Sequence, residues 1–178
     1  MNLTAAFHMG IIKLDEIVPA VEKLSTGRRW LIGGRVYRTI AAELYGTPMK
    51  ESDFDFLVEN SRCAVVPGWA IERNRHNGVK LRRGKDSIDI MSLQTYEPFD
   101  VLDVPRTIES FLDCVPFTIQ SIAYDLQERK IIGDVGIAAL MNQKVEVHNA
   151  KIAERYAESY HTTIEKRRKK IATSLYFS

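Results

Sequence analysis

The 178-residue sequence is 45% hydrophobic and 27% charged, with a formal net charge of +2, values that are ordinary for one globular domain. No apolar run approaches the roughly 20 residues of a membrane helix, which excludes a membrane-spanning chain. The N-terminal residues lack the pattern of a signal peptide, and Cys63 and Cys114 have no metal-ligand spacing, so we expect a cytoplasmic protein with reduced thiols and no membrane partner.

Hydrophobic periodicity, with glycine and proline at the breaks, predicts helices and strands in the first half of the chain. In chain order these are a helix over residues 11–24, a strand over 29–32, a helix over 36–44, a strand over 54–58, and a hairpin with arms 78–82 and 87–93. The hairpin turns at residues 83–86, and a loop containing His76 precedes it. Pro19 is expected to bend the first helix or to mark a later start.

The second half predicts further elements by the same signals. They are a helix over residues 105–113, a hairpin over 117–126 and 130–132, a helix over 135–141, a strand over 144–147 and one long helix from 149 to about 175. Because strands and helices do not alternate strictly, the predicted class is α+β, a small mixed sheet flanked by helices. We expect a main domain over residues 1–147, followed at 148–178 by a basic helix that packs on it or on a partner.

Positive charge gathers at the C-terminal end. From residue 144 onward eight Lys or Arg stand against four Glu, so this part carries +4 and the remainder −2. The densest run, Lys-Arg-Arg-Lys-Lys, occupies residues 166–170. A basic end on a mildly acidic body indicates a polyanionic partner such as a nucleic acid, and a solvated helix face explains it as well.

Two carboxylates belong to one face of the predicted strand 54–58. Because strand side chains alternate, Asp53 and Asp55 project together while the phenylalanines beside them point into a core. Carboxylates with Cα atoms about 7 Å apart repel each other unless a cation lies between them. Asp89, in the next apolar strand, supplies a third acid, with Asp86 at the turn as the alternative. Such a set suits two Mg²⁺ ions about 3.5–4 Å apart.

A pair of glycines, Gly33 and Gly34, joins the predicted strand 29–32 to the helix that follows it. Glycine lets the backbone approach a ligand closely, and the start of a helix offers unpaired N–H groups to phosphate. Arg35 and Arg38 add positive charge there. A tight turn without a ligand explains the glycines in isolation, but with two acids about twenty residues downstream the pattern favours a nucleotide site.

Three segments, in this order, resemble the head domain of the tRNA nucleotidyltransferases and bacterial poly(A) polymerases. They are Leu-Ile-Gly-Gly-Arg-Val at residues 31–36, Asp-Phe-Asp-Phe at 53–56 and Phe-Thr-Ile-Gln-Ser-Ile-Ala-Tyr-Asp at 117–125. The likeness extends over roughly residues 29 to 147. It implies the polymerase-β-like fold and the transfer of a nucleoside monophosphate from a nucleoside triphosphate to an acceptor hydroxyl, with release of pyrophosphate.

The resemblance also implies roles for individual residues. Asp53 and Asp55 would bind the metal ions, and Asp89 would join them and help to activate the attacking hydroxyl. Gly33 and Gly34 would contact the triphosphate. Catalysis of this kind consists mainly of positioning and charge neutralisation, so it demands few other residues. The acceptor is left open: RNA, a protein or a small molecule.

The chain departs from the family at two places. Residues 36–38 read Val-Tyr-Arg where the family has Val-Arg-Asp, and residues 114–116 read Cys-Val-Pro where it has Arg-Arg-Asp. About thirty residues follow the similar region, too few for the neck and body that select the base and hold RNA in the family. Two other functions therefore stay open. One is a degenerate nucleotide-binding or regulatory, antitoxin-like protein, and the other is a nucleic-acid-binding module that uses its basic C-terminal helix.

Overall fold

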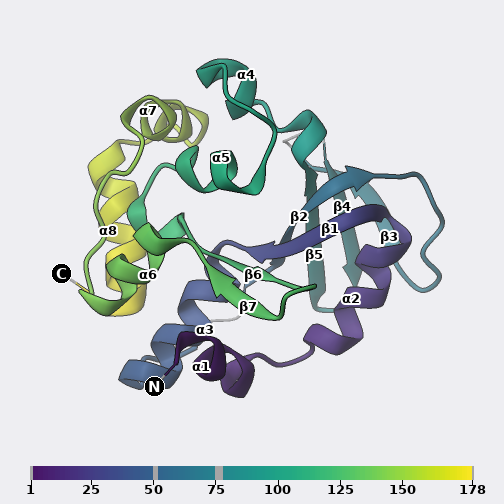
Figure 1. Cartoon of the computed structure of the whole chain (residues 1–178), viewed down its shortest axis with the longest axis horizontal. Helices are drawn as coiled ribbons and strands as arrows, with labels where there is room; N and C mark the ends of the chain where they lie inside the picture. The colour runs from purple at the N-terminus through teal and green to yellow at the C-terminus, as the bar shows by residue number, and fades with distance from the viewer. Residues whose placement is uncertain (1, 50–51, 75–77, 178) are drawn as a thin grey trace.

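A seven-stranded mixed sheet forms the centre of the molecule in the computed structural model (Figure 1). The structure describes residues 2–49, 52–74 and 78–177, so His76 lies outside the described residues. The strand order is β3-β4-β5-β2-β1-β6-β7. The strands are β1 Ser25–Ile32, β2 Phe54–Ser61, β3 Ala70–Arg73, β4 Val79–Arg83, β5 Asp86–Ser92, β6 Ala123–Asp125 and β7 Lys130–Ile132.

Helices cover both faces of this sheet, which confirms the predicted α+β class. They are α1 Leu3–Gly10, α2 Leu14–Lys23, α3 Gly34–Tyr45, α4 Pro98–Leu102, α5 Ile108–Asp113, α6 Asp134–Met141, α7 Ala150–Ser159 and α8 Ile164–Leu175, with 3-10 turns η1 Leu93–Thr95 and η2 Thr118–Gln120. Within the described ranges, none of these helices is long and apolar enough to cross a membrane.

The alternation of strand side chains divides the interior into two clusters. Leu31 and Phe56 belong to the larger cluster, which α1, α2, α3, α6 and α8 complete on one face of the sheet. Trp30 and Leu57, one position away on the same strands, belong to a smaller cluster with α4 and α5. Side chains of opposite parity therefore face different layers. In Figure 1, α7 and α8 lie at the end of the molecule away from the β3–β4 hairpin.

The segment over residues 117–126 corrects the predicted long strand. Only β6 is extended there, and η2 precedes it. The reason is a close approach of α6: the Gly136 N–H donates to the Ser121 carbonyl at 3.0 Å, and a Cβ at Gly136 would lie 2.4 Å from that oxygen. The helix therefore takes the backbone group that a neighbouring strand would have used.

The C-terminal region corrects the prediction of one uninterrupted helix. The chain leaves α7 at Tyr160, His161 takes a positive φ of 50°, and α8 begins after Thr163, whose hydroxyl accepts from the Lys166 N–H at 3.2 Å. Thr163 is thus an ordinary N-cap in a segment without glycine or proline. Ile171 and Leu175 of α8 lie in the larger cluster.

Other boundaries also differ from those predicted. The helix over residues 105–113 begins only at Ile108, because Thr107 caps it by accepting from the Ser110 N–H. Residues 144–147 form no strand beyond an isolated bridge between Phe117 and Val147. The helices α1 and α4, the strand β3 and the two 3-10 turns were not predicted. The first predicted helix starts later than residue 11, and Pro19 lies inside it.

Candidate active site

The parallel pairing of β2 and β5 brings the predicted acids together. Asp55 of β2 stands opposite Asp89 of β5, and Asp53 lies one residue before β2 begins. The neighbours Phe54 and Ile88 are buried in the larger cluster, so the acids emerge on the other face of the sheet. The apolar residues of both strands thus fix the position of the carboxylates.

A lysine lies between two of these acids. The Lys80 Nζ atom is 2.9 Å from Asp53 Oδ2 and 2.7 Å from Asp89 Oδ2. Lys80 stands directly opposite Asp89 in the antiparallel β4–β5 pair. Burial opposes the charged form of this ammonium, but the hydrogen bonds to Asp89 and Asp53 outweigh it, so the pKa of Lys80 is raised.

Among the described residues, Asp55 forms no ion pair, although it lies near the other two carboxylates. Burial, and then the carboxylates of Asp89 and Asp53, raise its pKa from 3.8 to about 7, against the opposing effect of Lys80 and Arg38. A hard divalent cation would relieve this repulsion, and carboxylate oxygens are the ligands that Mg²⁺ prefers. Asp53 and Asp55 therefore fit such an ion. Within the part of the chain that the structure describes, however, no group of three or more His, Cys, Asp or Glu side chains is arranged to hold a metal ion.

The glycine turn lies against the acids. Gly33 has a φ of 71°, a conformation that side chains rarely adopt, and a Cβ at this position would lie 2.8 Å from Asp55 Oδ2. Gly33 is also the N-cap of α3 and supplies no side-chain cap. The first N–H groups of α3 thus point toward the region beside Asp55 without a side chain between them, as anion binding requires.

The two predicted basic residues have different surroundings. The Arg38 guanidinium folds back over the turn, so that a Cβ at Gly34 would lie 3.2 Å from its Cζ atom, and among described residues its buried Nε atom has no hydrogen-bond partner. The Arg35 Cζ atom instead lies 4.2 Å from the centroid of the Phe54 ring. Phe54 belongs to the larger cluster, and Arg35 is 6% exposed. The structure therefore brings Arg38, and not Arg35, toward the acids.

At the two departures from the resemblance, uncharged side chains are buried in the two clusters. Tyr37 is buried, which raises its pKa to about 12 and keeps its phenol neutral. Cys114 and Val115 are buried in the smaller cluster. Tyr37 belongs to the larger cluster and Cys114 to the smaller one, so the two residues lie on different faces of the sheet.

A cleft of about 1030 Å³ opens beside the acids. Gly33 and Asp55 line one end, and α7 forms the opposite wall. Aromatic rings line its sides: Tyr96 packs on Phe111 with centroids 5.0 Å apart, and Tyr156 packs on Tyr160 at 4.8 Å. Volumes of several hundred Å³ with apolar walls and a few polar groups are typical of small-molecule sites.

Two charged side chains connect α7, which we call the far wall of the cleft, to its surroundings. Arg167 of α8 lies 3.8 Å from the Tyr160 ring centroid and 4.8 Å from that of Tyr156. Arg155 of α7 forms an ion pair with Glu97, which lies across the cleft before α4. The wall is therefore held in place from both sides, by a stacked guanidinium and by an ion pair.

Sequence reasoning missed Lys80 as a partner of the acids, although a signal for it exists. If residues 83–86 form the turn, Arg83 pairs with Asp86, and counting back along both arms places Lys80 opposite Asp89. The alternative third acid, Asp86, instead pairs with Lys13 at 2.8 Å. No comparable signal places α7 across the cleft, because that contact depends on the tertiary arrangement.

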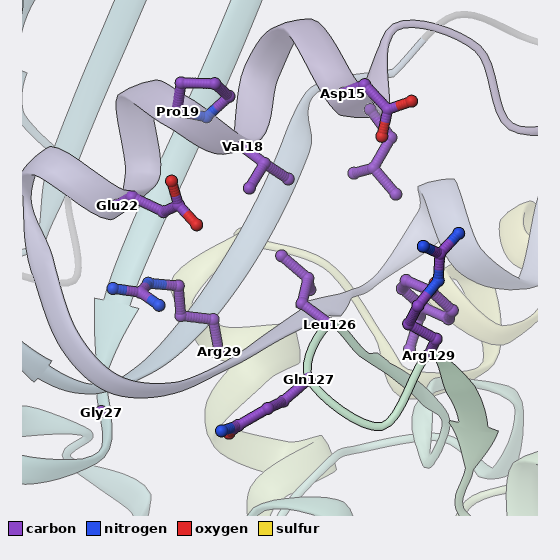
Figure 2. A pocket seen from close by; sticks show the side chains of 11 residues that line it. Asp15, Val18, Pro19, Glu22, Gly27, Arg29, Leu126, Gln127 and Arg129 are labelled. Atoms are coloured by element: carbon purple, nitrogen blue, oxygen red, sulfur yellow. The ribbon is translucent and has the colours of Figure 1, made fainter.

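A second, smaller groove of about 430 Å³ lies between α2 and the β6–β7 turn. Figure 2 shows Glu22 of α2 pointing toward Arg29, and Asp15 above Arg129, with Val18 between them. Its acids and bases thus face each other within the protein. This groove has none of the excess negative charge that marks the cleft.

Comparison with known proteins establishes the fold. No family model and no curated protein matches the sequence. Among solved structures, the Thermotoga maritima CCA-adding enzyme complexed with tRNA matches with a TM-score of 0.54 and 17% identity, over 84% of this chain and 36% of that one. A tRNA nucleotidyltransferase complexed with a primer tRNA and an incoming ATP analog matches with a TM-score of 0.49 and 18% identity, over 68% of this chain and 36% of that one.

The first of these likenesses shows that the chain has the fold of the part of the CCA-adding enzyme that it covers, which confirms the predicted nucleotidyltransferase-like architecture. The chain spans little more than a third of the length of that enzyme. The roles of Asp53, Asp55, Asp89, Gly33, Gly34, Arg35 and Arg38 stay predictions.

Proposed function

We propose that the chain is a metal-dependent nucleotidyltransferase, which transfers a nucleoside monophosphate from a nucleoside triphosphate to an acceptor hydroxyl and releases pyrophosphate. The observation that carries this proposal is the proximity of Gly33 to Asp55: the start of a helix and a carboxylate that suits a metal ion line the same cleft. A triphosphate and its cation need these two features side by side.

The glycine turn would hold the triphosphate. The first N–H groups of α3 carry the positive end of the helix dipole, and Gly33 leaves them accessible. Arg38, which lies over Gly34, would add a full positive charge. Its buried Nε atom, without a hydrogen-bond partner among described residues, would then donate to a phosphate oxygen.

Asp53 and Asp55 would hold magnesium against this triphosphate. When bound, the ion would neutralise charge on the reacting phosphate and bring it to the acceptor. The protein would contribute a prearranged pair of carboxylates, fixed by the buried apolar side chains of β2. The raised pKa of Asp55 is consistent with this assignment: burial, and then the nearby carboxylates of Asp89 and Asp53, disfavour its negative charge, and a bound cation would favour that charge again.

The rest of the cleft would hold the nucleoside. Its aromatic side chains, Tyr96 from one side and Tyr156 and Tyr160 from α7, offer surfaces on which a base can stack. We propose RNA as the acceptor, because the basic helix α8 adjoins this wall through Arg167. Phosphates along that helix would then lead an RNA end toward the cleft.

The proposal is tested by label transfer. The protein is incubated with Mg²⁺, each α-labelled nucleoside triphosphate in turn, and either total cellular RNA or total protein. We expect label in RNA, and we expect Asp53→Asn with Asp55→Asn to reduce transfer at least about a hundredfold. Asp113→Asn, which removes an exposed carboxylate elsewhere, is the matched control and keeps wild-type transfer.

Other outcomes identify the competing functions. Binding of triphosphate without transfer to any acceptor would indicate a degenerate or regulatory protein. Label in protein would retain the reaction and refute the RNA acceptor. Retention of RNA that survives the double substitution, with no transfer and no triphosphate binding, would indicate a nucleic-acid-binding module.

A further inference from the structure

Lys80 occupies the position between Asp53 and Asp89 where a cation would otherwise lie. Its Nζ atom is within hydrogen-bond distance of one oxygen from each acid, and its side chain is only 15% exposed. The backbone fixes this placement, because Lys80 and Asp89 are directly paired across β4 and β5. The contact is therefore part of the hairpin and not a chance arrangement of a long surface side chain.

Both oxygens of Asp89 are engaged by the protein. Lys80 donates to Oδ2 at 2.7 Å, and the Asn74 side-chain amide donates to Oδ1 at 3.1 Å. The Gly78 N–H in turn donates to Asn74 Oδ1 at 2.8 Å, which orients the amide so that its nitrogen points at Asp89. Asp89 is thus held by two donors that would have to move before it could bind a metal ion.

Asp53 and Asp55 are arranged differently. Lys80 contacts only Oδ2 of Asp53, whose side chain is 49% exposed. Asp55 lines the cleft, and none of the described residues donates a hydrogen bond to it. With Arg38 assigned to the triphosphate, the three ionised carboxylates and the Lys80 ammonium leave two negative charges, which one divalent ion neutralises.

We propose that Lys80 replaces the second divalent ion of a two-metal site, so that this chain binds one Mg²⁺ per active site, on Asp53 and Asp55. Asp89 then anchors Lys80 and is not a metal ligand. This inference rests on the proposed function, because it concerns the metal content of the same site. Lys80 is a positioning residue in this scheme: its ammonium holds Asp53 and Asp89 together and excludes a second ion.

The test is the number of divalent ions bound. Mn²⁺ is titrated into the protein together with a non-hydrolysable triphosphate analogue, and free Mn²⁺ is measured by electron paramagnetic resonance, with the analogue alone as a blank. We expect one site in wild type and two in Lys80→Met. Lys80→Arg, which keeps the positive charge, should retain one site, and Lys85→Met, on the exposed turn of the same hairpin, is the matched control.

Two sites in wild type would overturn the inference, and so would a single site in Lys80→Met. In either case the proposed function would survive, since the protein would still bind metal with its triphosphate. No Mn²⁺ beyond the blank in wild type would refute the inference and the proposed function together. The number of sites therefore distinguishes the two failures.

A second variant keeps the test decisive if Lys80→Met does not fold. Asp89→Asn retains an oxygen for Lys80 but lacks the charge of a good metal ligand. We expect it to bind Mn²⁺ within about twofold of wild type, whereas Asp53→Asn should weaken binding at least about tenfold. Equal losses in both variants would show that Asp89 is a metal ligand and would overturn the inference.

Discussion

Two aspartates of the sheet, Asp125 and Asp55, have opposite environments. Asp125 is fully buried and accepts hydrogen bonds from Arg28, from Trp30 Nε1 and from the N–H groups of Gln127 and Glu128. Burial opposes its charge, but the bonds from Glu128, Arg28 and Gln127 outweigh that effect and lower its pKa. Burial, and then the carboxylates of Asp89 and Asp53, raise the pKa of Asp55 to about 7.

The difference separates a carboxylate that the fold stabilises from one that we propose binds a metal ion. The donors around Asp125 come from the chain itself, so its charge is already compensated. The charge of Asp55 is not, and a fold that tolerates such repulsion at the end of a cleft loses stability there. Substitutions at the two positions should therefore have opposite effects on stability and activity.

The largest effect is expected on activity. Asp55→Asn should lower nucleotide transfer on the order of 10³-fold, because it removes a charged ligand of the proposed metal ion. Single-turnover kinetics with labelled triphosphate measures this loss. Asp125→Asn should retain transfer within about tenfold in the folded protein. Equal losses in the two variants would contradict the distinction.

The next effect concerns stability. Asp125→Ala leaves the Trp30 indole N–H and two backbone N–H groups without their acceptor, so we expect the free energy of unfolding to fall by about 3 kcal/mol. Urea unfolding followed by tryptophan fluorescence measures the change. Asp100→Ala, which breaks the exposed ion pair with Arg106, is the control and should cost less than about 1 kcal/mol. Similar losses would show that Asp125 has no special structural role.

The contributions of Asp125 and Asp55 to the free energy of unfolding should change with pH in opposite directions. The pKa of Asp125 is lowered, so its stabilisation is present above the ordinary aspartate pKa, about 4, and is lost as the pH falls through its folded value. The pKa of Asp55 is raised, so its stabilisation is present below pH 4 and is lost as the pH rises through about 7.

Asn variants measured in chelator isolate these contributions. Asp55→Asn should be more stable than wild type by on the order of 2 kcal/mol at pH 8, with the difference shrinking toward pH 4. Asp125→Asn should be less stable than wild type at pH 7, with the difference shrinking in acid. Urea unfolding between pH 3 and 8 checks both, and a parallel pH dependence of the two differences would refute the assignment.

The smallest effect comes from the glycine beside Asp55. Gly33→Ala combines a positive φ with a Cβ 2.8 Å from a carboxylate oxygen, whereas Gly46→Ala has a similar φ of 65° and no neighbour within 4 Å. Gly46 is left-handed, so Gly46→Ala should lose about 1–2 kcal/mol of stability, and Gly33→Ala should lose about 1–3 kcal/mol because Gly33, with ψ −156°, lies in a region that only glycine readily adopts. Only Gly33→Ala should also weaken binding of a triphosphate analogue, measured by calorimetry. Equal affinity in the two variants would show that the turn does not contact the ligand.

Local patterns predicted the part of the fold that carries the acids. The strand before Gly33, the helix α3, the strand β2 and the β4–β5 hairpin follow from periodicity and turn residues, and together they bring Asp55 to Asp89. The failures have two causes, a contact with another element and a cap without glycine or proline. Residues 117–126 bend because α6 takes the Ser121 carbonyl, and α7 and α8 separate at a threonine cap and not at a glycine.

The predicted site was incomplete for a similar reason. Its acids and glycines lie in short motifs, whereas the far wall of the cleft belongs to α7, about a hundred residues later in the chain. Arg35 stands next to the glycines in the sequence but packs on Phe54, because neighbouring positions of a helix point in different directions. Adjacency in the chain was therefore a poor guide to which arginine faces the acids.

The parallel alignment of β2 with β5 has one last consequence. A slip of one residue between them would turn Asp89 inward and carry Ile88 or Ile90 out to water, because side chains alternate along a strand. Burial of the hydrophobic side chains therefore fixes the register of the two strands, and with it the positions of the acids. Misaligned molecules would lose their packing together with the grouping of the acids, so preparations should contain no well-folded isomer in which Asp55 and Asp89 are apart.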